Sequence, residues 1–210
     1  MIISIDGPAA AGKGTLAKRI AARLDLAYLD SGALYRAVGL AVLNAGGDPA
    51  DPDTATAAAE ALDHGTLGAP ALRTDRVAAA ASQVAAIPSV RAALLDFQRR
   101  FAATPPDGKA GAVLDGRDIG TVVCPDADVK LFVTASVEER ARRRVKELLE
   151  RGEEAIYGAV LQEMQDRDAR DRDREVAPLT PAEDAIVIDT TDLDADAALE
   201  AALRFISDIR

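Results

Sequence analysis

Two glycines, a lysine, a third glycine and a threonine stand close together after the first six residues, in nearly the order that phosphate-binding loops use. The stretch GPAAAGKGT begins at Gly7, and Gly7, Gly12 and Lys13 keep the spacing G-x-x-x-x-G-K. The common pattern continues with Ser or Thr. Here Gly14 follows, and the hydroxyl comes one position later, at Thr15. Glycines allow the backbone to turn successive N–H groups toward one anion, and the lysine reaches the β- and γ-phosphates.

This glycine-rich stretch is predicted to lie between a buried strand and a helix, which is the setting of a phosphate loop. The apolar run of residues 1–6 precedes it, and residues 12–24 show the spacing of an amphipathic helix. The start of such a helix adds partial positive charge to the loop. The alternative is a plain glycine turn in front of a helix. The residues expected to hold the phosphates are Gly7, Pro8, Ala9, Ala10, Ala11, Gly12, Lys13, Gly14 and Thr15.

Polar side chains also follow the second predicted strand, residues 26–30. Asp30 ends this strand, Ser31 follows it, and Arg36 lies one turn into the next predicted helix. Open α/β sheets bind ligands at the carboxyl ends of their strands, so Arg36 is a candidate clamp for a second phosphate. In the alternative interpretation, Asp30 and Ser31 cap the helix and Arg36 points into solvent.

The third predicted strand, residues 111–116, leads into a charged turn with the sequence LDGRD. Asp115 stands at the strand end, where phosphate-loop folds place Mg²⁺-associated or structural carboxylates. Thr15, on the first helix, is the other candidate near the metal. Arg117 could bridge two phosphates, and Asp118 follows it directly. The alternative is a plain turn with no role in binding.

Short apolar runs alternate with helical patterns along the chain. The predicted strands are residues 1–6, 26–30, 111–116, 128–135 and 185–190. The predicted helices include residues 12–24, 33–46, 136–152 and 194–209. This alternation indicates an α/β fold with a parallel sheet covered on both faces. A mostly helical insertion separates the second and third strands and suggests a separate lobe.

Two charged segments follow the fourth predicted strand. Residues 136–152 form a predicted helix, with Ser136 and Glu139 in the positions of a capping box. Residues 167–181 are rich in Arg and Asp and show no apolar face, so we expect them to lie outside the core. The arginines of both segments are therefore expected to serve ligands or solvent.

Composition narrows the classes of partner. The chain has 20 Arg, 5 Lys and a net charge of −10, so clustered Arg suits small anions while the overall charge opposes nucleic-acid binding. Cys124 is the only cysteine, which excludes a disulfide within the chain and fits a reducing cytoplasm. No apolar run approaches the roughly 20 residues of a membrane span. We expect a cytoplasmic protein without nucleic-acid or membrane partners.

Five longer motifs follow the phosphate loop in a fixed order. They are LDSGALYRA, ASQVAAIPSVRAALLDFQR, DGRDIGTVVCPDADVKLFVTAS, EERARRR and RDARDRDREVAPL. With the ending G-K-G-T of the loop, they make the chain similar to the bacterial cytidylate kinases over nearly its whole length. Members of this family are nucleoside monophosphate kinases that phosphorylate CMP and dCMP.

The resemblance implies a phosphate-loop NTPase-like, three-layer fold with a five-stranded parallel sheet. It implies a single domain, with a core of residues 1–30, 110–145 and 180–210. Residues 31–109 would form an inserted monophosphate-binding lobe, and about 146–179 an Arg-rich lid. It further implies ATP as phosphoryl donor, Mg²⁺, CMP or dCMP as acceptor, a monomer, and a place in pyrimidine nucleotide metabolism.

The resemblance also carries roles over to matching positions. It places Ser82 and Arg91 on the cytosine edge, where Asp118 would accept a hydrogen bond from the N4 amine. It places Asp171 near the ribose and phosphates and Arg174 on the acceptor nucleotide. From the residues alone, without the resemblance, Ser82 would be interpreted as a hydroxyl on a helix surface, and residues 167–174 as a solvent-exposed helix. The substrate-binding residues expected are Asp30, Ser31, Arg36, Ser82, Arg91, Arg117, Asp118, Asp171 and Arg174, and the catalytic ones are Lys13, Arg117, Arg143 and Arg167.

Three other functions compete with this interpretation. A kinase for UMP or shikimate would share the loop and the lid but not the set Ser82, Arg91 and Asp118. A phosphate-loop switch that binds nucleotide without turnover would not need a second lobe. A structural protein with an unused glycine turn is the simplest alternative. The sequence leaves the preference between CMP and dCMP open.

Overall fold

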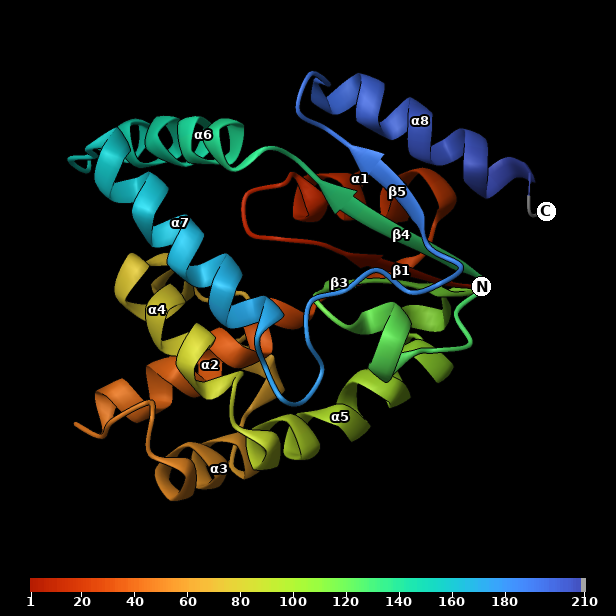
Figure 1. Ribbon diagram of the computed structural model, residues 1–210. Coiled ribbons are helices and arrows are strands. Elements are labelled where there is room, and N and C mark those ends of the chain that lie inside the picture. Colours follow the sequence, from red (N-terminus) through yellow and green to blue (C-terminus); the bar gives the residue numbers. More distant parts are fainter. Residues whose placement is uncertain (209–210) are drawn as a thin grey trace.

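A parallel five-stranded sheet forms the centre of the computed structural model, which describes residues 1–208 (Figure 1). The strands lie in the order β2-β3-β1-β4-β5. All four neighbouring pairs are parallel, so the carboxyl ends of the strands meet at one edge. Their bounds are Ile2–Asp6 (β1), Ala27–Asp30 (β2), Ala112–Gly116 (β3), Val129–Thr134 (β4) and Ile186–Asp189 (β5). The predicted fold class is confirmed.

Helices cover both faces of the sheet, as the alternation of patterns predicted (Figure 1). Ile209, at the end of the last predicted helix, lies outside the described residues. A short π-helical turn, η4 (Ile119–Val123), follows β3, and short 3₁₀ turns lie at 64–66, 70–73 and 106–108. The α-helices are Lys13–Leu24 (α1), Ser31–Asn44 (α2), Pro52–Glu60 (α3), Asp75–Val84 (α4), Pro88–Ala103 (α5), Val137–Glu150 (α6), Tyr157–Arg172 (α7) and Ala195–Asp208 (α8).

The sheet separates two apolar clusters, because successive side chains of a strand point to opposite faces. Val113 packs with residues of α1 and α8, including Ile20 and Ile206. Its neighbours on β3, Ala112 and Leu114, pack on the other face against η4 and α5. β1, β2 and β3 therefore contribute to apolar clusters, with β3 packed on both faces, and the polar residues that follow these strands are held at a rigid edge.

Two further apolar clusters lie away from the sheet. One joins α2, α4 and α5 and includes Leu34, Val38 and Val84, each fully buried. The other joins α6 and α7, where Leu148 packs with Met164. The inserted helices and the α6–α7 pair therefore each have packing of their own.

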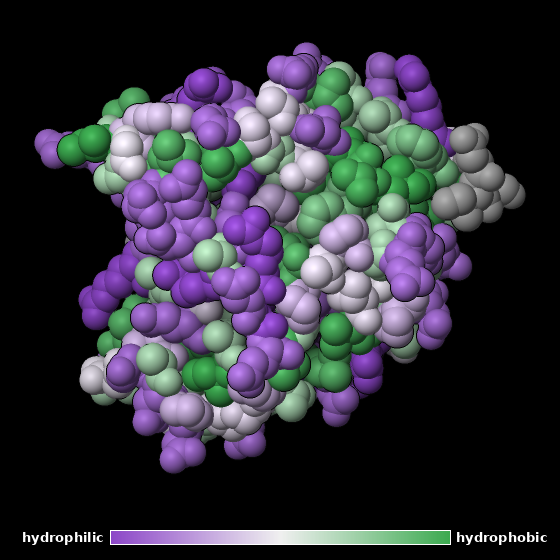
Figure 2. Space-filling view, viewed as in Figure 1, coloured by the Kyte–Doolittle hydropathy of each residue, from purple (hydrophilic) through white to green (hydrophobic). Residues whose placement is uncertain are grey.

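Hydrophilic residues dominate the surface over α7 (Figure 2). Hydrophobic residues reach the surface beside β5 and α8, where Val187 and Phe205 are exposed, and between α6 and α7, where Leu149 and Ile156 are exposed (Figure 2). Within residues 1–208, no single helix is both long enough and apolar enough to cross a membrane.

The predicted capping box of α6 is only half formed. Ser136 Oγ accepts a hydrogen bond from the N–H of Glu139 at 3.3 Å. The second bond of a capping box would run from the N–H of Ser136 to the Glu139 carboxylate. Here Ser136 donates this N–H to Thr191 Oγ1 at 2.9 Å instead. The Glu139 carboxylate instead pairs with Arg142 and Arg143.

The charged segment of residues 167–181 differs from the prediction, which kept it out of the core. α7 ends at Arg172, so Arg174 lies beyond the helix. Asp171 is only 1% exposed, and Ala177 and Leu179 are buried. Asp171 is buried because it pairs with Arg117 from another segment of the chain, which a helical pattern does not reveal. Most other charged residues of the stretch, among them Arg170 and Asp173, are exposed as expected.

Gly7 tests the connection between β1 and the loop. Its φ is +144°, and a Cβ there would lie 1.9 Å from the carbonyl oxygen of Val133. We expect Gly7→Ala to lower the free energy of unfolding by at least about 2 kcal/mol through strain and overpacking, which is a fall in Tm of about 4 °C or more. Gly158→Ala is the control, since Gly158 lies in α7 with open space around it and alanine favours the helix. Equal melting temperatures for the two variants would contradict this account.

Candidate active site

A cleft with a volume of about 530 Å³ opens at the carboxyl edge of the sheet. The phosphate loop and the starts of α1 and α2 form one side, and α4 and α7 face them. Ten Lys or Arg side chains and seven Asp or Glu side chains line it, in a chain whose net charge is −10. The cleft therefore gathers positive charge where an anion would sit. The basic residues are Lys13, Lys18, Arg36, Arg73, Arg91, Arg117, Arg144, Arg151, Arg167 and Arg174.

The phosphate loop has the backbone conformation that its glycines predicted. Ala10 and Gly12 adopt φ values of +56° and +89°, and α1 begins at Lys13. Gly14 is explained by its surroundings, since a Cβ there would lie 3.2 Å from Asp115 Oδ2. The glycine in place of Ser or Thr therefore makes room for a carboxylate, and Thr15 supplies an exposed hydroxyl instead.

Lys13 and Asp115 are both buried in the cleft, which shifts their titration. Lys13 Nζ donates to the carbonyl of Pro8 at 2.9 Å. Burial and the nearby Arg117 guanidinium lower the pKa of Lys13 to about 7. Burial and the Asp30 carboxylate raise the pKa of Asp115 to about 6, and Tyr28 donates its hydroxyl to Asp115 at 3.1 Å. An arriving anion would therefore stabilise the charged form of Lys13.

Asp30 both caps α2 and holds Arg36. One oxygen accepts from the N–H of Ala33 at 3.1 Å, and the other pairs with Arg36 at 2.6 Å. The capping expected in the alternative interpretation is therefore present, yet Arg36 lines the cleft and its Nε has no partner. Ser31 is buried beside it and also lines the cleft.

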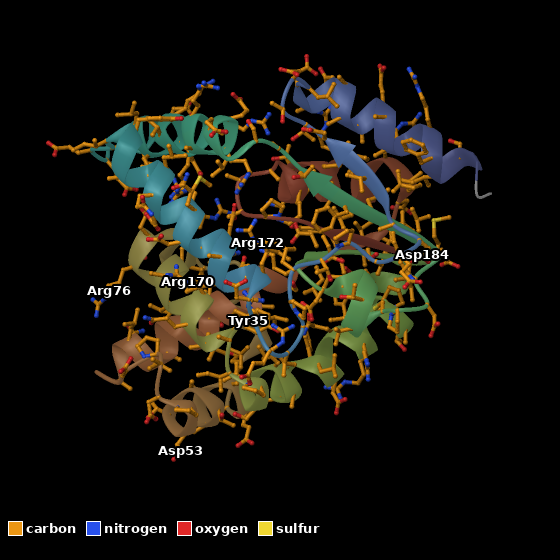
Figure 3. The ribbon with its side chains drawn as sticks, in the orientation of Figure 1. Tyr35, Asp53, Arg76, Arg170, Arg172 and Asp184 are labelled. Atoms are coloured by element: carbon orange, nitrogen blue, oxygen red, sulfur yellow. The ribbon has the colours of Figure 1, made fainter. Side chains whose placement is uncertain are left out.

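A second polar group lies where α4, α5 and the turn after β3 meet. Arg91 and Asp118 form a buried ion pair, and the Arg91 guanidinium lies 5.5 Å from the centre of the Tyr35 ring. Tyr35 is labelled in Figure 3, where it lies near the middle of the molecule. Ser82 is buried and lines the same part of the cleft. Four side chains from distant parts of the sequence thus surround one end of the cavity.

Asp171 organises the arginines on the opposite side. It accepts from Arg117 Nε at 2.9 Å and also pairs with Arg174. Burial alone would raise the pKa of Asp171, but the guanidinium groups of Arg117 and Arg174 lower it. Arg167 lines the cleft with its buried Nε unpartnered, and burial and Arg117 lower its pKa to about 10. A cation without a carboxylate partner is thus left for a ligand.

α6 and α7 reach across the mouth of the cleft to the inserted helices. Arg144 pairs with Asp75 at the start of α4, and Arg151 donates to the carbonyl of Arg73 at 2.8 Å. Arg170, on α7, lies toward α4 (Figure 3) and is 3.4 Å from Ser82 Oγ. These contacts hold the two sides of the cleft together.

Four predicted site residues do not line the cleft. Gly7, Pro8 and Ala11 belong to the back of the loop. Arg143 departs from the expectation that it faces a phosphoryl group, because its guanidinium donates to Glu139 Oε1 at 3.2 Å and to Thr190 Oγ1 at 3.1 Å. The predicted residues that line the cleft are Ala9, Ala10, Gly12, Lys13, Gly14, Thr15, Asp30, Ser31, Arg36, Ser82, Arg91, Asp115, Arg117, Asp118, Arg167, Asp171 and Arg174.

Sequence reasoning gave no individual role to several lining residues, among them Arg144 and Arg151. Arg144 lies on α6 and Arg151 directly follows its last residue, seven positions later, so the two share a face, and that spacing was the available signal. For Lys18, the only sequence signal of a place in the cleft was its position about one turn after the phosphate loop. Arg73 lies in a stretch that no pattern singled out.

A parallel sheet with a glycine loop, a buried lysine and an arginine-lined cleft at its carboxyl edge defines the class of phosphate-loop α/β proteins. A family model described as cytidylate kinase matches residues 3–208. The chain belongs to the cytidylate kinase family, and the resemblance noted from the motifs is confirmed.

Individual relatives agree with this assignment. The cytidylate kinase of Paramagnetospirillum magneticum is 66% identical over 209 residues, which is 100% of this chain and 99% of that one. The cytidylate kinase of Rhodospirillum rubrum is 62% identical, over 97% and 95% of the two chains. A solved Thermus thermophilus structure is 22% identical with a TM-score of 0.50, covering 99% and 96% of the chains, and supports the fold alone.

The titration of Lys13 provides a direct test of the charge in the cleft. Its folded pKa of about 7 lies below the ordinary lysine value, so it is mainly neutral at pH 8 and protonated at pH 5.5. We expect saturating sulfate to raise the pKa of Lys13 by more than about one unit, because an anion favours the ammonium form. NMR titration of labelled lysines measures this, with Lys13→Arg for assignment and the exposed Lys146 as control. A Lys13 that titrates near 10 without anion would contradict the account.

Proposed function

We propose that this chain transfers the γ-phosphoryl group of ATP to CMP or dCMP within the cleft, giving ADP and CDP or dCDP. The observation that supports this proposal most is that one cavity is lined both by the phosphate loop and by the group Ser82, Arg91 and Asp118. Arg117 and Arg167 line the same cavity, and both interact electrostatically with Asp171. A kinase with two nucleotide substrates needs such sites in one cavity.

The donor end is argued from the loop. Lys13 and the loop N–H groups hold the donor phosphates, and the start of α1 adds partial positive charge. Mg²⁺ binds the donor when the enzyme is loaded and neutralises phosphate charge. The donor set fits this hard cation, since the exposed Thr15 hydroxyl and the Asp115 carboxylate both line the cleft. Among the described residues, no cluster of three or more Asp, Glu, His or Cys occurs that could hold a metal ion by itself.

The acceptor end reads the phosphate and the base separately. Arg36, with its unpartnered Nε, clamps the acceptor phosphate, and Asp30 and Ser31 support it. Asp118 accepts a hydrogen bond from the cytosine N4 amine, and Ser82 and Arg91 meet the O2 and N3 side. Asp171 and Arg174 adjoin the ribose and phosphate of this nucleotide.

Arg117 and Arg167 act on the transferring group. ATP and CMP bring roughly six negative charges together, and transfer depends on in-line positioning and charge neutralisation more than on a strong base. Arg167 is suited to this role because its buried Nε has no hydrogen-bond partner among the described residues, and Arg117 because Asp171 holds it in place. Both are available before substrate arrives, which limits reorganisation during the reaction.

The division of the chain into moving parts belongs to the proposal. Residues 31–109 form the acceptor lobe, about 146–179 form the lid, and the remaining residues form the core. The separate apolar cluster of the lobe supports its boundary. The α6–α7 cluster joins Ala141 of the core to Leu148 and Met164 of the lid, so it connects these two parts. Closure would exclude water, which otherwise competes for the phosphoryl group.

The cellular setting also belongs to the proposal. We infer a monomeric cytoplasmic enzyme of pyrimidine nucleotide metabolism, without nucleic-acid or membrane partners. The net charge of −10 supports the first exclusion, because polyanions would be repelled outside the cleft. The single cysteine suits a reducing compartment.

Replacing Lys13 tests the donor end. We expect Lys13→Met to fold normally and to lower kcat at least about a hundredfold, because transition-state charge loses a preorganised cation. Thr15→Ala is expected to lose less. Coupled assays with ATP and CMP measure this, and Lys146→Met is the control because Lys146 is exposed. A Lys13→Met enzyme that keeps more than about a tenth of wild-type kcat would remove the loop from the mechanism.

Replacing Asp118 tests the reading of the base. We expect Asp118→Asn to lower the CMP over UMP ratio of kcat/KM by roughly 10- to 100-fold, since the N4 amine loses its charged acceptor. The measurement compares CMP, dCMP, UMP, AMP and GMP as acceptors. Asp126→Asn is the control, because Asp126 is exposed and the chemical change is identical. An unchanged ratio in a folded Asp118→Asn enzyme means that the carboxylate does not read the base.

A further inference from the structure

Three carbonyl groups of the phosphate loop are hydrogen-bonded by side chains. Lys13 binds the carbonyl of Pro8, as described above. Arg140 donates from NH1 to the carbonyl of Ala9 at 3.3 Å. Thr190 Oγ1 donates to the carbonyl of Ala11 at 3.0 Å. Arg140 and Thr190 are buried and are not among the residues that line the cleft, so both hold the loop from behind.

These bonds fix the direction of the N–H groups on the other side of the loop. In a planar trans peptide the C=O and the N–H point in opposite directions. When Arg140 binds the Ala9 carbonyl, the N–H of Ala10 must point away from it. The Thr190 bond has the same effect on the N–H of Gly12. Within the described chain these two N–H groups donate to no protein acceptor, so they are free for an anion.

Thr190 is in turn held by Arg143. The guanidinium donates from NH1 to Thr190 Oγ1 at 3.1 Å and from NH2 to the Thr190 carbonyl at 2.5 Å. Because the hydroxyl accepts from Arg143, its single proton is left for the carbonyls of Ala11 and Thr134, which lie at 3.0 and 3.1 Å. Arg143 therefore sets the direction in which Thr190 donates.

Arg140 is anchored as firmly. Its Nε donates to the carbonyl of Ala135 at 2.9 Å, and NH1 and NH2 bind both oxygens of Asp168 at 3.1 and 2.5 Å. Asp168 lies on α7 next to Arg167. Arg140 therefore ties the loop, the end of β4 and α7 to one another through a single rigid guanidinium.

We propose that Arg140, Thr190 and Arg143 are positioning residues that hold the phosphate loop from behind. They turn the N–H groups of Ala10 and Gly12 toward the donor phosphates before the donor binds. Arg143 touches no substrate and acts through Thr190. The inference rests on the proposed role of the loop in donor binding, and it assigns the precision of that site to side chains outside the cleft.

Kinetics of Thr190→Val test the inference, since this variant keeps the shape of the side chain and removes only the hydroxyl. We expect KM for ATP to rise about three- to tenfold while KM for CMP stays within about twofold. We expect kcat/KM for GTP to fall by the same factor as for ATP, because all donors share the phosphates. Thr190→Ser should restore activity, Arg143→Met should resemble Thr190→Val, and Arg142→Met, on an exposed side chain of the same helix, should match wild type.

Three kinetic results would overturn the inference. A loss confined to ATP would mean that Thr190 contacts the donor base. A lower kcat with unchanged KM for ATP in Arg143→Met would mean that Arg143 acts directly on the transferring group. Wild-type kinetics in a folded Thr190→Val enzyme would mean that the loop does not need the hydroxyl.

Backbone amide NMR separates this inference from the proposed function. We expect ADP to shift the Ala10 and Gly12 amide signals of the wild type. Thr190→Val should reduce the Gly12 response and Arg140→Met the Ala10 response. If ADP leaves both wild-type amides unmoved, the proposed role of the loop fails. If the wild type responds and the variants respond equally, the loop binds the donor but these side chains do not position it.

Discussion

Keeping many cations close together in one cleft is the constraint on which this molecule depends. Like charges in a site shielded from water repel one another, and burial disfavours each charge. Carboxylates offset this repulsion at defined points, since Asp171 pairs with Arg117 and Arg174, and Asp118 pairs with Arg91. The carboxylates hold the guanidinium groups in place without removing the net positive charge of the cleft.

Some donors of the positively charged groups in the cleft lack a partner among the described residues, and an anion could supply one. Lys13 has a lowered pKa, and the buried Nε atoms of Arg36, Arg167 and Arg174 lack partners. Unpartnered buried donors are unfavourable, and a polyanion would satisfy them. The cleft is thus preorganised for phosphate at the expense of the stability of the fold, which is a common compromise at binding sites.

The arginines of one helix, α6, make two different kinds of contact. On α6, Arg144 faces the cleft and pairs with Asp75 across its mouth. Arg140 and Arg143, on the same helix, are turned to the back of the phosphate loop and to Thr190. One helix therefore contacts both the inserted helices, through Arg144 and Asp75, and the phosphate loop, through Arg140.

The strands, the phosphate loop and the family were determined by the sequence alone, because each depends on local pattern. Strands follow from short apolar runs between turn signals, and the loop follows from glycine spacing between a strand and a helix. The carboxyl-edge rule then brought Lys13, Arg36, Asp115 and Arg117 to one cleft, since parallel strands end at one edge.

The tertiary structure alone decided which charged residues are buried and what they touch. Arg140 pairs with Asp168 from 28 positions away, and Thr190 bonds Ala11 from 179 positions away. No helical or strand period encodes such contacts, because they depend on how α6, α7 and β5 pack against the loop. Neighbouring arginines with the same local pattern therefore differ in environment: Arg142 is exposed, Arg143 faces Thr190, and Arg144 lines the cleft, because successive positions on a helix point about 100° apart.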